Sequence, residues 1–138
     1  MVDDMIYGYQ DDDFVVDEVA GKSLRSLTLF LDQGVPQKLI GELENGHPFH
    51  CYLSAFIGFW SGLGESEYQE VRDDYAHCEA IDLAAQHGLV GAPIERAVCR
   101  RVGGRVQIDV VFDRGTLIMS EVDPSDPHSV SDVTFTAA

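Results

Sequence analysis

From residue 94 onward the chain alternates apolar and polar residues with a period of two, and this pattern constrains the fold more than any other. Two turn sequences interrupt the pattern, Gly103–Gly104 and Asp113–Arg114–Gly115. Such alternation is typical of strands, and short turns rich in Gly and Asp join antiparallel neighbours. The sequence therefore predicts a β-meander of three antiparallel strands, followed by a further strand over residues 130–136.

The same turns predict which side chains of the meander share a face. One face carries a set that we expect in the core: Val106, Ile108, Val110, Phe112, Ala97, Cys99 and Ile118. The opposite face is mixed, with Arg96, Arg100, Arg105 and Asp109 beside Val98, Val102, Val111, Leu117 and Met119. A sheet that is apolar on both faces has to be covered on both, so we expect helices on one face and the N-terminal segment or a partner on the other.

Residues 66–87 are predicted to form one long amphipathic helix. Ser66 and Gln69 match a capping box, and Gly88 supplies a C-terminal stop. The apolar stripe at helical spacing consists of Tyr68, Val71, Tyr75, Cys78, Ile81 and Ala85. The other faces are acidic, and their residues are Glu67, Glu70, Asp73, Asp74, Glu79 and Asp82. We therefore expect the helix to present a negative ridge to solvent.

Shorter segments complete the prediction. Residues 26–31 are predicted to form a strand that ends in a turn. Pro36 suits the first position of a short helix that ends at Asn45–Gly46. Residues 49–63 fit a helix better than a strand, because their aromatic side chains recur at helical spacing. Residues 1–18 form either a pair of edge strands with a charged turn or a partly ordered acidic arm.

These elements predict an α+β fold. We expect a single acidic domain over residues 1–138, because this length lies near the commonest domain size. An antiparallel sheet that includes the C-terminal β-meander would pack against one long amphipathic helix and one or two shorter helices.

The charge of the chain narrows the class of partner. Its 24 acidic and nine basic residues give a formal net charge of −15 at pH 7, and seven of the acids lie in residues 1–18 without any base. A field of this sign repels nucleic acid and anionic membrane and attracts basic proteins. We therefore expect a basic protein partner, and neither a nucleic-acid nor a membrane partner.

Cysteine content and the N-terminal sequence predict a cytoplasmic location. Cys51, Cys78 and Cys99 are an odd number of cysteines without a CxxC spacing, which is typical of proteins with reduced thiols. The first five residues are acidic where a cleaved export signal would be basic.

His47, His50 and Cys51 are the best candidates for chemistry. A Cys beside a His suits nucleophilic catalysis, and both residue types bind zinc. Their spacing matches no known signature, and the chain holds no phosphate-binding loop or dinucleotide fingerprint. We therefore predict no enzyme, no catalytic residue, no metal site and no cofactor. A small enzyme or ligand-binding domain built on His47, His50 and Cys51 is kept as the first alternative.

The acidic residues favour a binding function. We expect a module that occludes a basic partner, as an immunity-type inhibitor does when its carboxylates block the phosphate-binding cleft of a toxic nuclease. The expected contact residues are Asp11, Asp12, Asp13, Glu67, Glu70, Asp73 and Asp74, with Tyr68 and Tyr75 as aromatic anchors. A homo-oligomeric assembly protein is the second alternative, because a sheet that is apolar on both faces suits a homodimer.

Overall fold

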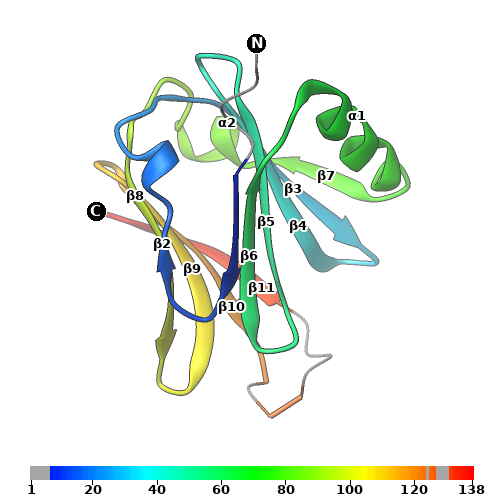
Figure 1. Cartoon of the computed structure of the whole chain (residues 1–138), viewed down its shortest axis with the longest axis vertical. Helices are drawn as coiled ribbons and strands as arrows, with labels where there is room; N and C mark the ends of the chain where they lie inside the picture. Colours follow the sequence, from blue (N-terminus) through cyan, green and yellow to red (C-terminus); the bar gives the residue numbers. More distant parts are fainter. Residues whose placement is uncertain (1–6, 124, 127–130) are drawn as a thin grey trace.

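Two antiparallel sheets pack face to face in the computed structural model, which describes residues 7–123, 125–126 and 131–138 (Figure 1). Sheet A contains, in spatial order, β1 (Gly8–Asp11), β6 (Ile57–Gly62), β5 (Pro48–Ser54), β4 (Val35–Leu43), β3 (Leu24–Asp32) and β7 (Glu79–Asp82). Sheet B contains, in spatial order, β11 (Ser131–Ala137), β10 (Gly115–Glu121), β9 (Arg105–Phe112), β8 (Ile94–Val102) and β2 (Phe14–Val15).

The helices of the described chain are short. They are the α-helices α1 (Glu65–Asp74) and α2 (Leu83–His87) and the 3₁₀ helix η1 (Asp17–Val19). Figure 1 shows α1 on the side of sheet A that faces away from sheet B. Among the described residues, no helix has the length and apolar composition that a membrane crossing requires.

A hydrophobic core fills the space between the two sheets. Phe49 and Trp60 of sheet A stack there with ring centroids 4.8 Å apart, and neither ring exceeds 1% exposure. Sheet B contributes every second residue of β9, which are Val106, Ile108, Val110 and Phe112. The period of two in this segment therefore builds the core, as the sequence predicts.

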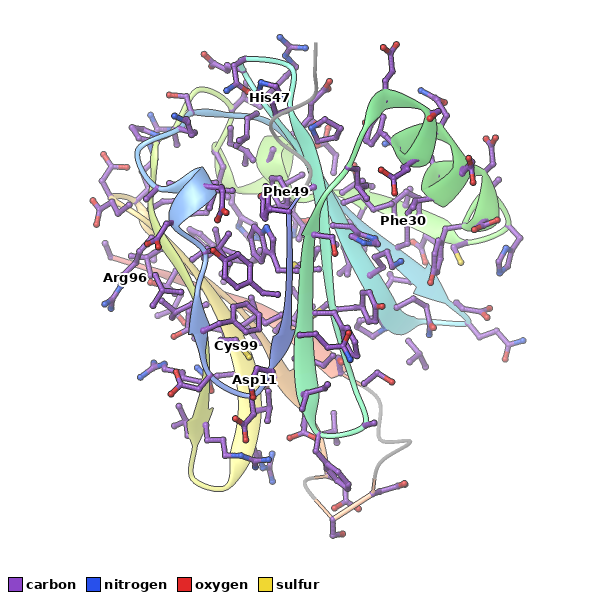
Figure 2. All side chains as sticks on the ribbon, in the orientation of Figure 1. Asp11, Phe30, His47, Phe49, Arg96 and Cys99 are labelled. Carbon is purple, nitrogen blue, oxygen red and sulfur yellow. The ribbon has the colours of Figure 1, made fainter. Side chains whose placement is uncertain are left out.

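A second apolar layer lies on the outer face of sheet A. Phe30 on β3 and Ile40 on β4 are 4% and 1% exposed, yet they do not belong to the core between the sheets. The chain after α1 covers this face, because Tyr75 packs on Phe30 with 5.9 Å between ring centroids. Figure 2 shows Phe30 on the α1 side of the molecule. Sheet A is thus buried on both faces over part of its width.

The protein is mostly β, so the predicted α+β fold with one long amphipathic helix is wrong. The helix expected over residues 66–87 ends at Asp74, and the amide of Cys78 donates to the carbonyl of Tyr75 in the turn that follows. Residues Glu79–Asp82 then pair with β3 as the edge strand β7. Pairing with an otherwise open sheet edge outweighs the helical pattern in this segment.

The predicted shorter helices are also wrong. The segment that begins at Pro36 belongs to β4, and residues 49–63 lie mainly in the hairpin of β5 and β6. Asn45–Gly46 lies in the turn between β4 and β5, where the amide of Gly46 donates to the carbonyl of Leu43. One face of these strands packs in the core, and the other packs in the second apolar layer on the outer face of sheet A. Both faces therefore carry apolar residues, and the strands lack the alternation typical of a half-buried strand.

The C-terminal meander is confirmed as β8, β9 and β10, with β11 as the further strand. Its register differs from the predicted one after the second turn. Phe112 pairs with Gly115, so the turn contains two residues instead of three. Leu117 and Met119 are therefore buried in the core, whereas Ile118 lies on the outer face. A shift of one residue exchanges the two faces of a strand.

The N-terminal acidic segment forms two edge strands where the structure describes it. β1 pairs with β6 at the edge of sheet A, and β2 pairs with β8 at the edge of sheet B. Edge strands were one of the two predicted alternatives, but these strands lie in different sheets and do not pair with each other. The acidic turn between them therefore links the two sheets. Residues 1–6 lie outside the described part of the chain.

Candidate functional site

The predicted acidic contact residues of α1 all lie on its exposed side. With Glu65 added, the exposed carboxylates of this helix are those of Glu65, Glu67, Glu70, Asp73 and Asp74. Glu67 also stabilises the helix N-terminus, because its Oε1 accepts a hydrogen bond of 3.1 Å from the amide of Gly64. In the part of the chain that the structure describes, none of these carboxylates forms an ion pair. Their negative charge is therefore available to a partner.

The two tyrosines expected as aromatic anchors, Tyr68 on α1 and Tyr75 at its end, are half-buried. The guanidinium of Arg72 donates to the hydroxyl of Tyr68 over 3.3 Å and lies 5.5 Å from the centroid of its ring. The same guanidinium lies 5.9 Å from the ring of Phe30, on which Tyr75 packs. Tyr75 thus contacts the sheet directly, and Tyr68 is linked to it through Arg72, while part of each tyrosine side chain stays exposed.

An aromatic pair that the sequence analysis missed lies on the same outer face of sheet A. Tyr52 on β5 and Phe59 on β6 stack with ring centroids 4.7 Å apart and ring planes 9° apart. Both side chains are only half-buried. The turn that brings them together, Ala55–Phe56, contains no Gly, Asn or Asp, so the sequence carries no signal for this hairpin.

Lys38 joins the aromatic pair to the end of α1. This side chain is 8% exposed, and its Nζ lies 4.6 Å from the ring centroid of Tyr52 and 5.0 Å from that of Tyr75. Burial lowers the pKa of Lys38, and the neighbouring Cys51 and Asp74 oppose this shift. Attraction between the ammonium and the two rings replaces part of its lost hydration. No sequence pattern singled out Lys38, since a lone lysine usually marks an exposed position.

His50 lies on the same face of sheet A as Lys38. His50 is the strand-pairing partner of Ile40 on β4. The imidazole packs edge to face on the ring of Tyr52, with 5.7 Å between ring centroids. The Nδ1 atom of His50 is buried without a hydrogen-bond partner among the described residues. Burial, and then the charge of Lys38, lower the pKa of His50 to about 4. The imidazole is therefore neutral at physiological pH.

The three residues proposed for chemistry, His47, His50 and Cys51, do not converge. Cys51 is 0% exposed in the core, whereas His50 lies on the opposite face because successive side chains of a strand alternate. His47 lies in the turn before β5. Burial raises the pKa of the Cys51 thiol far above its usual range, which disfavours the thiolate. Within the described residues, no three His, Cys, Asp or Glu side chains gather as metal ligands would.

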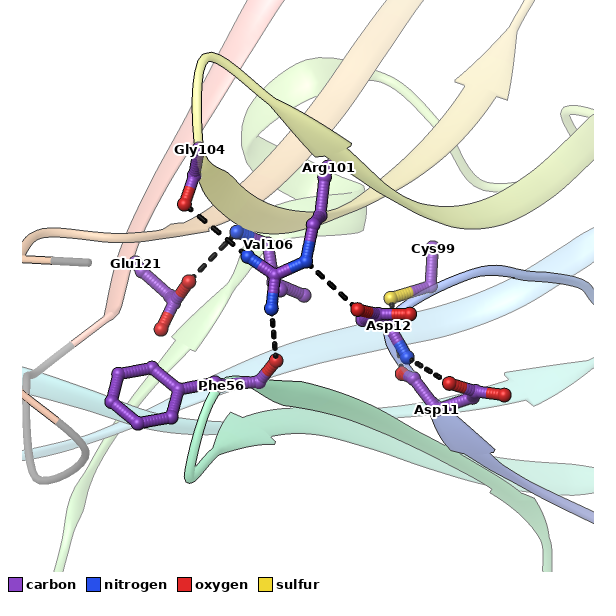
Figure 3. Close-up of polar contacts among 8 residues, drawn as sticks. All are labelled: Asp11, Asp12, Phe56, Cys99, Arg101, Gly104, Val106 and Glu121. Carbon is purple, nitrogen blue, oxygen red and sulfur yellow. Dashed lines mark hydrogen bonds and ion pairs between the residues drawn. The ribbon is translucent and has the colours of Figure 1, made fainter. Parts of the chain in front are cut away.

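The acidic turn between β1 and β2 lies away from α1, and Figure 2 shows Asp11 beside Cys99 of sheet B. Asp12 forms an ion pair of 2.8 Å with Arg101, whose hydrogen bond holds the pKa of this carboxyl below its usual range. The same guanidinium donates to the carbonyl of Phe56 over 3.5 Å (Figure 3). Asp12 is thus engaged within the protein, whereas Asp11 and Asp13 are exposed. The predicted contact residues therefore fall into two separate groups.

The outer face of sheet B carries much of the apolar surface that suggested a homodimer. Asp109 is 3% exposed there, and it accepts hydrogen bonds from Arg100 over 2.8 Å and from Gln107 over 2.6 Å. Val98 and Ile118 lie beside this cluster, and part of each side chain is exposed. The homodimer stays a prediction.

Comparisons of the chain with protein-family models, with curated proteins and with solved structures found no match. The function is therefore inferred from the geometry and chemistry of the surface around α1.

Proposed function

We propose that the protein is a cytoplasmic inhibitor of immunity type, which binds a basic partner protein through the α1 face. The α1 face consists of the exposed carboxylates of α1 and the aromatic side chains beside them: Glu65, Glu67, Glu70, Asp73, Asp74, Tyr52, Phe59, Tyr68 and Tyr75. The observation that carries this proposal is that carboxylates without an ion pair and half-buried aromatic rings lie together on one surface.

This combination has the two properties on which protein recognition depends. Aromatic residues that become buried at an interface often dominate the binding energy, and Tyr52 and Phe59 offer two stacked rings for that purpose. Lys38 connects Tyr52 to Tyr75 at the end of α1. The carboxylates of this helix raise the rate of association with a cationic partner and disfavour an acidic one. The α1 face thus supplies both the charge that attracts a basic partner and the aromatic side chains that can anchor it.

A toxic nuclease is the kind of basic partner that fits the α1 face. The catalytic cleft of a nuclease binds phosphates through cationic side chains, and carboxylates form strong hydrogen bonds with the same groups. α1 has ten residues, so it is about 15 Å long. A helix of that length, acidic on its exposed side, can lie along such a cleft and exclude the nucleic acid.

The test is a pull-down from the lysate of the native source at about 50 mM salt, where surface charges are only partly screened. Wild-type protein is compared with two triple variants. E70Q/D73N/D74N removes charge from the α1 face, and D11N/D13N/D17N removes the same charge from exposed residues elsewhere. Thermal unfolding of each variant verifies that it folds before the comparison is made.

We expect the wild type and D11N/D13N/D17N to recover one basic protein in equal molar amount, and E70Q/D73N/D74N to lose it. With the purified partner, E70Q/D73N/D74N should associate about tenfold more slowly, with a weaker dependence on salt. Equal recovery by both variants, or recovery of no basic protein, would contradict the proposal.

A further inference from the structure

Four hydrogen-bond donors on the outer face of sheet A have no acceptor in the described part of the protein. They are the ammonium of Lys38, the ring N–H of His50 and the hydroxyls of Tyr52 and Tyr75. No hydrogen bond or ion pair joins any of these groups to another described residue. Nδ1 of His50 is buried and Lys38 is 8% exposed, whereas Tyr52 and Tyr75 are half-buried. Buried polar groups are normally paired, so the absence of partners for His50 and Lys38 requires an explanation.

The four groups come from three parts of the chain and form one continuous set of contacts. Lys38 lies on β4, His50 and Tyr52 lie two residues apart on β5, and Tyr75 follows α1. The Nζ of Lys38 lies between the rings of Tyr52 and Tyr75, at 4.6 and 5.0 Å from their centroids. The ring of His50 contacts that of Tyr52. The fold thus assembles a cluster that no short sequence motif encodes.

Burial of an unpaired ammonium opposes folding, which makes Lys38 difficult to explain as a structural residue. The side chain is 8% exposed, and its described contacts are two aromatic rings, which replace lost hydration only in part. The nearby carboxylate of Asp74 acts on Lys38 electrostatically, but it is exposed and forms no ion pair with it. An apolar residue of similar length would fill the same space without this penalty.

The protonation states of the neighbours make the cluster rich in donors. Burial raises the pKa of Tyr52 and of Tyr75, so both hydroxyls keep their protons at neutral pH. His50 is neutral, because burial and the charge of Lys38 lower its pKa to about 4. A neutral imidazole carries one N–H. One positive charge and three neutral donors therefore belong to one network of contacting side chains, without a carboxylate bonded among them.

We propose that Lys38, His50, Tyr52 and Tyr75 bind a small oxyanion, namely the carboxylate or phosphate group of a free small molecule. Lys38 supplies the opposite charge, and the imidazole and the two hydroxyls donate hydrogen bonds to the oxygens. This site shares Tyr52 and Tyr75 with the α1 face but contains none of its carboxylates, which attract the basic partner in the proposed function. K38M and E70Q/D73N/D74N change different side chains, so failure of one proposal can be distinguished from failure of the other.

The test is an NMR titration of the full chain with sodium acetate and, separately, with inorganic phosphate, at constant ionic strength set by NaCl. We expect saturable shifts of the ring signals of His50, Tyr52 and Tyr75, with a Kd below about 10 mM. K38M should weaken binding about tenfold or more, because it removes the charge and keeps the length of the side chain. H50Q, which retains an N–H donor, should bind more tightly than H50L.

K22M is the matched control, because Lys22 is exposed and lies outside the cluster. Its Kd should equal that of the wild type. Saturation by acetate alone assigns a carboxylate ligand, saturation by phosphate alone assigns a phosphate, and saturation by both assigns any small oxyanion. Shifts that stay linear to about 50 mM of both anions, or equal binding by K38M, overturn the proposal. The wild-type titration decides by itself if K38M fails to fold.

Discussion

Gly41 shows how tightly the core constrains a single residue. A Cβ at this position would lie 2.4 Å from Cζ of Phe49, well inside van der Waals contact. The ring of Phe49 has no room to move, because it is 1% exposed and stacked on Trp60. We therefore expect Gly41→Ala to lower the free energy of unfolding by about 1–3 kcal/mol, measured by urea denaturation.

Gly8→Ala is the control for Gly41→Ala, because both glycines lie in strands of sheet A. A Cβ at Gly8 would lie 3.6 Å from Oγ of Ser61, an ordinary contact. This variant should match the wild type or gain up to about 1 kcal/mol, since alanine restricts the unfolded chain more than glycine does. Equal unfolding free energies for the two variants would show that the Phe49 ring does yield.

His50 should make the stability of the protein depend on pH below neutrality. Its pKa is lowered from 6.5 to about 4, so the unfolded chain takes up a proton at a higher pH than the folded chain. The contribution of His50 is therefore complete above pH 6.5 and is lost as the pH falls towards 4. Lys38 and Tyr52 surround the ring and maintain this difference.

We expect the wild type to lose about 1 kcal/mol relative to H50L between about pH 6.5 and pH 5, after allowance for partial exposure of the ring. The difference between the two proteins removes the effect of the many carboxylates that titrate in both. H77L, at an exposed histidine, should follow the wild type. The unfolding free energies are measured by chemical denaturation at each pH. If those of the wild type and H50L change in parallel between about pH 6.5 and pH 5, His50 accepts a proton in the folded state as readily as in the unfolded chain.

At the scale of elements, the hairpin of β5 and β6 contains an unfavourable turn. Ser54 pairs with Ile57, so the turn residues are Ala55 and Phe56, whose φ angles are 51° and 69°. Left-handed backbone at a residue with a Cβ costs about 1–2 kcal/mol, whereas Asn-Gly adopts this turn readily. A55N/F56G should therefore raise the free energy of unfolding by about 1–2 kcal/mol, measured in urea.

Q33N is the control for the turn substitution. Gln33 has φ of 52° in the turn between β3 and β4, where Gly34 already supplies the second left-handed residue. Q33N should raise the free energy of unfolding by only a few tenths of a kcal/mol, because it places asparagine, which tolerates left-handed backbone, at one position only. A larger gain from Q33N than from A55N/F56G would mean that the Phe56 side chain stabilises the hairpin more than its backbone strain opposes it.

These turns also explain which elements the sequence predicts. The meander of β8, β9 and β10 was predicted because its turns contain Gly103–Gly104 and Asp113, residues that mark tight turns by their own chemistry. The hairpin at Ala55–Phe56 has no such residues, and sheet A has apolar residues on both faces. Its strands therefore resembled buried helices, and only pairing between distant strands distinguishes the two.

At the scale of the whole molecule, only part of the candidate site could be predicted from the sequence. Glu67, Glu70 and Asp73 were placed on an exposed helix face because the first turns of the predicted helix are correct. The proximity of Lys38 to Tyr52 depends on the pairing of β4 with β5, and that pairing is not local information. The aromatic and cationic part of the site therefore emerged only from the fold.

The net charge of −15 should oppose folding, because compaction brings like charges together. Among the described residues the ion pairs are Arg25–Glu42, Arg100–Asp109 and Arg101–Asp12, and each arginine side chain is about half exposed. Such pairs contribute little to stability. Raising NaCl from about 10 to about 300 mM, which shortens the screening length severalfold, should therefore raise Tm by about 5 °C in calorimetry.

E70Q/D73N/D74N separates the role of α1 in binding from its role in folding. Removal of three negative charges should raise Tm at low salt and reduce the response to salt, because these carboxylates have no ion pairs among the described residues. A higher Tm would mean that the acidic residues of α1 lower the stability of the free protein, as expected where binding to a partner requires them. A variant that is less stable than the wild type at low salt would instead make these carboxylates part of the fold, through the attraction between Asp74 and Lys38. That result would weaken the case for the α1 face as a binding surface.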